Sequence, residues 1–208
     1  MKRLGIYFFF DKDGIVDKYI DYVLEDLTKH VDKLIVVCNG QLNERGRKTF
    51  EKFTGNIIVR ENKGFDVWAY KTAIDSEGWN KLIEYDEIIL MNYTIMGPVY
   101  PLKEMFDIMD KRLELDFWGI TKCFQENSPV AQQIWQCPYG YIPEHIQSSF
   151  MAFRRSIVSS TIFQKYWDEM PMIKSYYESG GSHEQYITKY FSDNGYRWDC
   201  YTNYDDMD

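Results

Sequence analysis

The sequence lacks the short motifs that mark several common enzyme classes. It contains no G-x-G-x-x-G for a dinucleotide, no Walker loop for a nucleoside triphosphate and no G-x-S-x-G nucleophile elbow. The cysteines form no C-x-x-C pair, which argues against a zinc site and favours free thiols in a reducing compartment. These four cysteines are Cys38, Cys123, Cys137 and Cys200.

The chain also lacks an excess of positive charge and a long apolar run. Its 24 Lys and Arg against 32 Asp and Glu give a net charge of −8, which argues against general affinity for nucleic acid or an anionic membrane. A local basic patch for phosphate stays open. The basic start and the apolar run Leu4 to Phe10 resemble a signal peptide, but the run ends at Asp11 without a cleavage site. We therefore expect a buried first strand in a cytosolic protein.

Aromatic residues are plentiful, at 17 % of the chain with 17 Tyr, 13 Phe and 6 Trp. Most of these rings are expected in the core, although flat aromatic faces also stack on the C–H faces of sugars. With 208 residues, 45 % of them hydrophobic, the chain fits a single domain over 1–208 with its own core.

Short apolar runs alternate with amphipathic stretches, which is typical of βαβ units. The pattern predicts an α/β fold with a Rossmann-like, mostly parallel sheet flanked by helices. Strands are expected at 6–10, 34–38, 56–60, 87–91, 116–121, 148–154 and 196–200. Helices are expected at 16–30, 44–53, 66–74, from Pro101 onward, 156–169 and 183–193. Residues 122–143 show no period and contain three prolines, so a long functional or mobile loop is expected there.

The first candidate site follows the third expected strand, because ligands of open α/β sheets gather at the carboxyl ends of strands. Gly64 permits close approach of the backbone, and the next helix offers free N–H groups to an anion. Arg60, Lys63 and Lys71 can supply the charge that a diphosphate needs. The competing interpretation, favoured by spacing alone, is a turn capped by Asp66 beside solvated lysines.

The fourth expected strand ends at Asn92-Tyr93-Thr94, where many sugar-nucleotide enzymes carry a D-x-D motif for a divalent cation. Asn92 and Thr94 can hydrogen-bond ribose or phosphate but are weak ligands for a cation. The metal ligands therefore stay unassigned.

Two further candidates lie in the second half. Glu184 opens a helix after Ser179-Gly180-Gly181-Ser182, and the helix dipole favours its ionised form, which can take a proton from an acceptor hydroxyl. Its competing interpretation is an ordinary acid at a helix start. His145, beside a strand, is open to three interpretations: a structural residue, an acceptor contact or a metal ligand.

Taken in order, these segments resemble the rhamnan synthesis protein F family of bacterial polysaccharide enzymes. The resemblance runs over nearly the whole chain. It rests on Arg60-Glu61-Asn62-Lys63-Gly64-Phe65-Asp66 with Ala69-Tyr70-Lys71, on Leu90-Met91-Asn92-Tyr93-Thr94 with Gly97-Pro98, on Asp116-Phe117-Trp118-Gly119, on His145-Ile146-Gln147-Ser148-Ser149-Phe150, and on Met170-Pro171, Glu184, Thr188, Tyr190-Phe191 and Gly195-Tyr196.

The resemblance implies a GT-A-like single domain that transfers rhamnose from dTDP-rhamnose, or a sugar from another sugar nucleotide, to a cell-surface glycan by an inverting mechanism. Residues 1–100 would bind the donor and 101–208 the acceptor. Glu184 would be the catalytic base. The donor-binding residues would be Arg60, Asn62, Lys63, Gly64, Asp66, Lys71, Asn92 and Thr94, and the acceptor-binding residues His145, Gln147 and Trp118.

One departure from the family pattern matters. The family tends to show Asn-Asp-Ser where this chain has Asn92-Tyr93-Thr94. Three consequences stay open: the enzyme works without Mn or Mg, other groups such as His145 or His183 hold the cation, or catalysis is impaired.

The implied partners are a sugar-nucleotide donor and a glycan or lipid-linked glycan acceptor, with no nucleic acid. Contact with the inner face of the membrane or with a polysaccharide-assembly complex is open. So are two other functions, a non-catalytic sugar- or nucleotide-binding module and an interaction domain. The ending Asp205-Asp206-Met207-Asp208 leads us to expect a piece of a longer protein.

Overall fold

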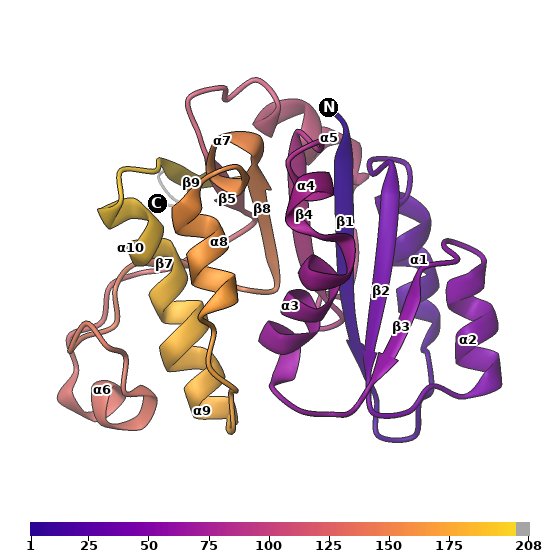
Figure 1. Ribbon diagram of the computed structural model, residues 1–208, viewed down its shortest axis with the longest axis horizontal. Coiled ribbons are helices and arrows are strands. Elements are labelled where there is room, and N and C mark those ends of the chain that lie inside the picture. The colour runs from indigo at the N-terminus through magenta and orange to yellow at the C-terminus, as the bar shows by residue number, and fades with distance from the viewer. Residues whose placement is uncertain (203–208) are drawn as a thin grey trace.

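The computed structural model describes residues 1–202, which form a seven-stranded sheet with helices on both faces (Figure 1). The acidic ending discussed above lies outside the described residues. The strand order is β3-β2-β1-β4-β8-β5-β9. The strands are β1 (Arg3–Phe10), β2 (Lys33–Asn39), β3 (Ile57–Arg60), β4 (Glu87–Asn92), β5 (Phe117–Gly119), β8 (Phe150–Arg154) and β9 (Trp198–Cys200). Only β8 runs antiparallel to its neighbours in this sheet, β4 and β5, within the described residues.

Helices cover the sheet in two layers. One layer holds α1 (Lys18–Leu27), α2 (Glu44–Glu51) and α5 (Leu102–Met109), and the other holds α3 (Phe65–Glu77), α8 (Thr161–Asp168) and α10 (Gln185–Asp193). The shorter elements are α4 (Trp79–Leu82), α6 (Pro129–Trp135), α7 (Arg155–Val158), α9 (Tyr176–Ser179), the π-helix η1 (Gly180–Glu184), and the two-stranded pair β6 (Lys122–Cys123) and β7 (His145–Ile146). In the part of the chain that is described, no helix combines the length and apolar character needed to span a membrane.

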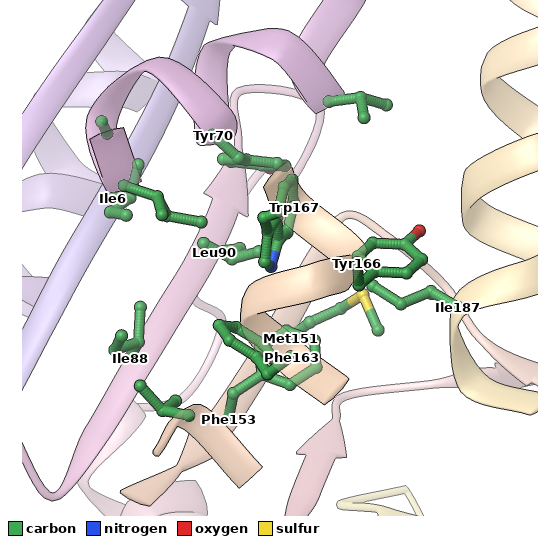
Figure 2. Close-up of a cluster of buried hydrophobic side chains, with 14 of the residues drawn as sticks. Ile6, Tyr70, Ile88, Leu90, Met151, Phe153, Phe163, Tyr166, Trp167 and Ile187 are labelled. Atoms are coloured by element: carbon green, nitrogen blue, oxygen red, sulfur yellow. The ribbon is translucent and has the colours of Figure 1, made fainter. Parts of the chain in front are cut away.

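The central strand β1 shows why the sheet is buried on both faces. Side chains alternate along a strand, and Leu4, Ile6 and Phe8 join the core under α3 and α8. Tyr7 and Phe9 join the opposite core under α1 and α5. Figure 2 shows part of the first core, where Ile6, Ile88 and Leu90 of the sheet face rings from α3 and α8. A strand covered on both sides is apolar throughout, as the sequence is here.

The predicted fold class, an α/β unit with a mostly parallel sheet flanked by helices, is confirmed. Two local expectations change. The single helix expected at 156–169 is divided into α7 and α8, because the Ser160 hydroxyl accepts the Phe163 N–H at 3.1 Å and starts a new helix.

The stretch 122–143, expected to be irregular, contains β6 and α6. Ser128 caps α6, accepting the Ala131 N–H, and Pro129 occupies its first turn. This Ser-Pro pair is an ordinary helix-start signal that the aperiodic surroundings obscured.

Candidate active site

A cavity of about 590 Å³ opens at the carboxyl ends of β1 and β4. This size is typical of a small-molecule site. Figure 1 shows the elements that contribute to its lining: the carboxyl end of β1 points toward the lower end of the molecule, where α6 and α9 also lie. The cavity is lined by Phe8, Phe10, Asn62, Phe65, Asp66, Asn92, Tyr93, Thr94, Trp135, Gln147, Ser148, Ser149, Tyr176, Ser179, Gly180 and Glu184.

Glu184, the predicted base, ends η1 and faces this cavity. Its Oε2 accepts hydrogen bonds from the Ser148 backbone N–H at 2.9 Å and from the Ser148 hydroxyl at 2.5 Å. Both bonds go to the same oxygen, so they orient the carboxyl group without using Oε1. A carboxylate held in this way by neutral donors keeps a lone pair for a proton.

Asp66 lies in the same cavity as Glu184, although the two residues are far apart in sequence. Its Oδ2 is 3.4 Å from the Asn92 side-chain nitrogen, and its Oδ1 is 3.4 Å from the Ser179 hydroxyl. Burial raises the pKa of Asp66, and the negative charge of Glu184 raises it further, while bonds from Asn92 and Val67 oppose the shift. The fold therefore brings two carboxyl groups within electrostatic reach of each other.

Asn92 and Thr94 form a polar floor at the end of β4. The Asn92 side-chain oxygen accepts the Thr94 hydroxyl at 2.5 Å and the Thr94 N–H at 3.1 Å, which leaves its nitrogen for Asp66. Between them, the Tyr93 ring packs edge-on against Phe8 and Phe9 at 5.7 and 5.9 Å. The Tyr93 ring therefore packs against these strand residues while it also lines the cavity.

The charge of the cavity is one-sided. Its lining residues, all within the described part of the chain, include the carboxyl groups of Asp66 and Glu184 and no lysine or arginine. Residues 1–202 contain no group of three His, Cys, Asp or Glu side chains that could hold a metal ion, so neither His145 nor His183 completes such a site. A divalent cation fits here only if it is shared between these carboxyl oxygens and the phosphate oxygens of a ligand.

Four predicted donor residues do not line the cavity: Arg60, Lys63, Gly64 and Lys71. Arg60 donates from Nη1 to the Asn39 side chain at 2.6 Å and to the Lys63 carbonyl at 2.9 Å, so it braces the loop. Lys63 pairs with Glu61 at the exposed surface, 2.8 Å apart. Lys71 pairs with Asp75 at 3.3 Å and lies over the Trp68 ring.

Gly64 has a structural role at the start of α3. Its φ of +76° is left-handed, and a Cβ there would lie 2.5 Å from the Trp68 side chain. Phe65 follows with a φ of 55°, an uncommon value for a bulky residue, and lines the cavity. The turn directs Asn62, Phe65 and Asp66 into the site.

Among the predicted acceptor residues, only Gln147 lines the cavity. Trp118 is fully buried, and its Nε1 donates to Glu87 at 2.8 Å in the core. His145 is 3 % exposed, with Nδ1 2.7 Å from the Pro143 carbonyl oxygen. Because both side chains are enclosed by the fold, we leave Trp118 and His145 out of the proposed acceptor site.

His183 immediately precedes the candidate base but has a structural environment. It is 1 % exposed, and its Nδ1 lies 2.7 Å from the Tyr166 hydroxyl. Burial lowers the pKa of His183 to about 3, so its ring is neutral at physiological pH.

Sequence reasoning missed Ser148, Trp135 and Tyr176. Ser148 stands in a segment that carried the family resemblance, but its bond to Glu184 joins residues 36 positions apart. Trp135 comes from the stretch expected to be irregular, and Tyr176 from the short helix α9. The only sequence signal for Trp135 and Tyr176 was the high aromatic content of the chain.

A profile of the family described as rhamnan synthesis protein F matches residues 34–208. The chain belongs to the rhamnan synthesis protein F family. Among curated proteins, this family member is 23 % identical over 150 residues to an uncharacterized protein, y4gN, of Sinorhizobium fredii. The alignment covers 72 % of this chain and 35 % of that protein, so the chain spans about a third of its curated relative.

Solved structures offer a more distant likeness. Glucosyl-3-phosphoglycerate synthase from Mycobacterium tuberculosis, in complex with UDP, superposes on this family member with a TM-score of 0.46 at 12 % identity, over 75 % of this chain and 57 % of that one. The same enzyme with Mn²⁺, UDP-glucose and phosphoglyceric acid gives the same TM-score and coverage at 13 % identity.

Proposed function

We propose that this chain is a GT-A-like glycosyltransferase domain that transfers rhamnose from dTDP-rhamnose to a cell-surface polysaccharide acceptor with inversion at the anomeric carbon. The observation that carries this proposal is the pairing of an oriented carboxylate, Glu184, with the polar group of Asp66, Asn92 and Thr94 in one cavity. Membership of the rhamnan synthesis protein F family supports the sugar chemistry.

In the proposed reaction, Glu184 takes the proton of an acceptor hydroxyl. The acceptor oxygen then forms a bond to the anomeric carbon as the bond from that carbon to the diphosphate oxygen breaks. Ser148 contributes by holding the Glu184 carboxyl group in place through its N–H and hydroxyl. The donor half, 1–100, would supply Asn62, Asp66 and Asn92, and the acceptor half, 101–208, would supply the base.

The charge of the cavity bears on the cofactor. A sugar nucleotide brings a negatively charged diphosphate to a cavity that already contains two carboxyl groups. Asp66 would hold Mn²⁺ or Mg²⁺ together with the phosphates, and the ion would neutralise charge on the leaving diphosphate. Burial raises the pKa of Asp66, so a cation shared with the donor phosphates would be needed to favour its ionised form.

The proposed setting follows from the substrates. The domain would meet its sugar nucleotide in the cytoplasm, at the inner face of the membrane if its acceptor is a lipid-linked glycan. A longer parent protein or an assembly complex would then bring the domain to its acceptor.

The test is a calorimetric titration of the protein with dTDP-rhamnose, with and without Mn²⁺, using UDP-glucose and GDP-mannose as controls. Selective, Mn²⁺-dependent binding of the thymidine donor is the expected result. Absence of binding for every donor under both conditions would refute the transferase proposal.

A second candidate, a binding module without turnover, is favoured by one observation. Tyr93 stands where the family resemblance leads us to expect an acid, and its partly buried ring packs against the core while it also lines the cavity. Donor binding without release of dTDP in the presence of acceptor glycan would indicate this function.

A further inference from the structure

Trp135 lines the cavity from an unusual helix. It is the last residue of α6, and no residue of that helix is fully buried. Val130 and Ile134 of the same helix are 65 % and 47 % exposed. A helix without buried residues contributes little to the hydrophobic core. Filling the core therefore does not account for the large ring at its end.

Two glycines hold Trp135 in position. Gly180 has φ and ψ of −64° and −57°, a helical conformation open to any residue, so the backbone does not require glycine. Glycine is required instead by the close approach of Trp135. A Cβ on Gly180 would lie 2.4 Å from the Trp135 ring, and one on Gly181 would lie 1.8 Å from the Trp135 carbonyl oxygen. The indole is therefore seated against the first turn of η1.

Part of the indole lines the cavity, where it is available to a ligand. Tyr176 and Tyr177 approach it with centroids 5.7 Å away at 57° and 64°, so neither stacks on it in parallel. Tyr176 also lines the cavity and is 66 % exposed. Indole faces of this kind pack against the C–H face of a pyranose, a ring with apolar faces and a polar rim.

The position of Trp135 points to the acceptor rather than the donor. Gly180 and Glu184 are the first and last residues of η1, so one short element joins the seat of the indole to the candidate base. A base must reach the acceptor hydroxyl, so the ring on the same wall faces the acceptor sugar. Gln147 and Ser149 offer polar groups for its rim.

We infer that Trp135, with Tyr176 beside it, forms a stacking subsite for a neutral pyranose of the acceptor glycan. This inference rests on the proposed function and adds the acceptor class to it. The acceptor sugar is inferred to be neutral because of the cavity lining. Among the described residues that line the cavity, Asp66 and Glu184 alone carry ionisable acidic or basic groups, so a uronic acid would be repelled.

The experiment measures saturation-transfer NMR from the protein, loaded with dTDP and Mn²⁺, to methyl α-L-rhamnopyranoside and to methyl glucuronide. The neutral glycoside should receive saturation in the wild type and the uronide should not. Trp135→Leu should weaken binding of the neutral glycoside about tenfold, and Trp135→Phe, which keeps a flat ring, should lose less. Calorimetry with dTDP-rhamnose should give the same Kd for both variants as for the wild type.

Ile134→Ala is the matched control, because it changes an exposed residue of the same helix that does not line the cavity. It should bind the glycoside as the wild type does. Gly180→Ala tests the seat of the indole independently and should weaken the glycoside as Trp135→Leu does.

The outcomes separate the two proposals. Unchanged glycoside binding in Trp135→Leu, or no binding to a wild type that binds dTDP-rhamnose, overturns the stacking subsite and leaves the proposed function intact. A wild type that binds no donor refutes the proposed function itself.

Discussion

The two walls of the cavity are built in different ways. The wall from residues 8–94 consists of strand ends and the start of α3, including Phe8, Asp66 and Asn92. The wall from residues 135–184 comes from α6, α9, η1 and the 147–149 segment. The first is anchored by the parallel part of the sheet. The second consists of short elements together with the 147–149 segment, where the Ser149 carbonyl accepts the Asn92 N–H at 3.0 Å. A rigid sheet edge suits a common ligand such as a nucleotide, whereas loops and short helices suit one that differs between relatives.

Side chains of the two walls also interact. Ser179 lies 3.4 Å from Asp66, and the charge of Glu184 contributes to the raised pKa of Asp66. The predictions below separate what each wall contributes.

The largest effect is expected at the second wall. Glu184→Gln removes the proton acceptor but keeps an amide oxygen for Ser148, so turnover should fall about 10²- to 10⁴-fold while donor affinity is unchanged. Release of dTDP from dTDP-rhamnose measures turnover, and calorimetry measures affinity. Turnover at the wild-type rate would show that Glu184 is not the base.

Asp66→Asn tests the first wall through two measurements. Donor binding should lose its dependence on Mn²⁺, and calorimetry measures this. The free protein should at the same time become more stable near neutral pH, because the folded-state pKa of Asp66 is raised and its ionised form carries a burial penalty.

The pH dependence of this stability gain follows from the two protonation states of Asp66. Above the folded-state pKa of Asp66 the penalty is present in full, and below its ordinary value of 3.8 the group is protonated in both states. The melting-temperature gain of the Asn variant should therefore shrink as the pH falls. Each kcal/mol corresponds to about 2–4 °C for a chain of this size. A gain that does not vary with pH would contradict this explanation.

Gly181→Ala tests how the second wall is seated. A Cβ there would lie 1.8 Å from the Trp135 carbonyl oxygen, so α6 or η1 must move, at a cost of about 1–3 kcal/mol in unfolding free energy. Denaturant unfolding measures this cost. Gly55→Ala is the control, because a Cβ on Gly55 meets nothing within 4 Å. Equal stability of the two variants would show that the seat is loose.

The smallest effects are expected for the lysines. Lys63→Ala and Lys71→Ala remove side chains that pair with Glu61 and Asp75 outside the cavity lining, so donor affinity should change less than about twofold. A loss of tenfold or more in calorimetry would restore the donor role that the sequence suggested for them.

Much of the first wall was predictable from the sequence. The apolar runs of β1, β2 and β4 identify buried parallel strands, and their carboxyl ends locate Asn62, Asp66 and Asn92 at one edge. The same rule suggested Lys63 and Lys71 as donor contacts. The rule specifies the edge of the sheet but not the direction in which a long side chain points. Lys63 points to Glu61 and Lys71 to Asp75, outside the cavity lining.

The second wall was predictable only in part. Glu184 was found as an acid at the start of a helical pattern, but its partner Ser148 and the π-helix that carries it were not. Trp118 illustrates the opposite error. A tryptophan in a motif suggests a sugar contact, yet its indole N–H pairs with buried Glu87, which also accepts Arg3 at 2.8 Å.

The sequence alone therefore determined most strands and helices and the sheet edge where the cavity lies, because these depend on periodicity and on local start and stop signals. The strand order, with β8 antiparallel, came from the tertiary structure. The tertiary structure alone decided which side chains meet: Asp66 with Glu184, Glu184 with Ser148, and Trp135 with Gly180. Those encounters depend on close approach between segments distant in the chain, and no local pattern encodes the distance between such segments.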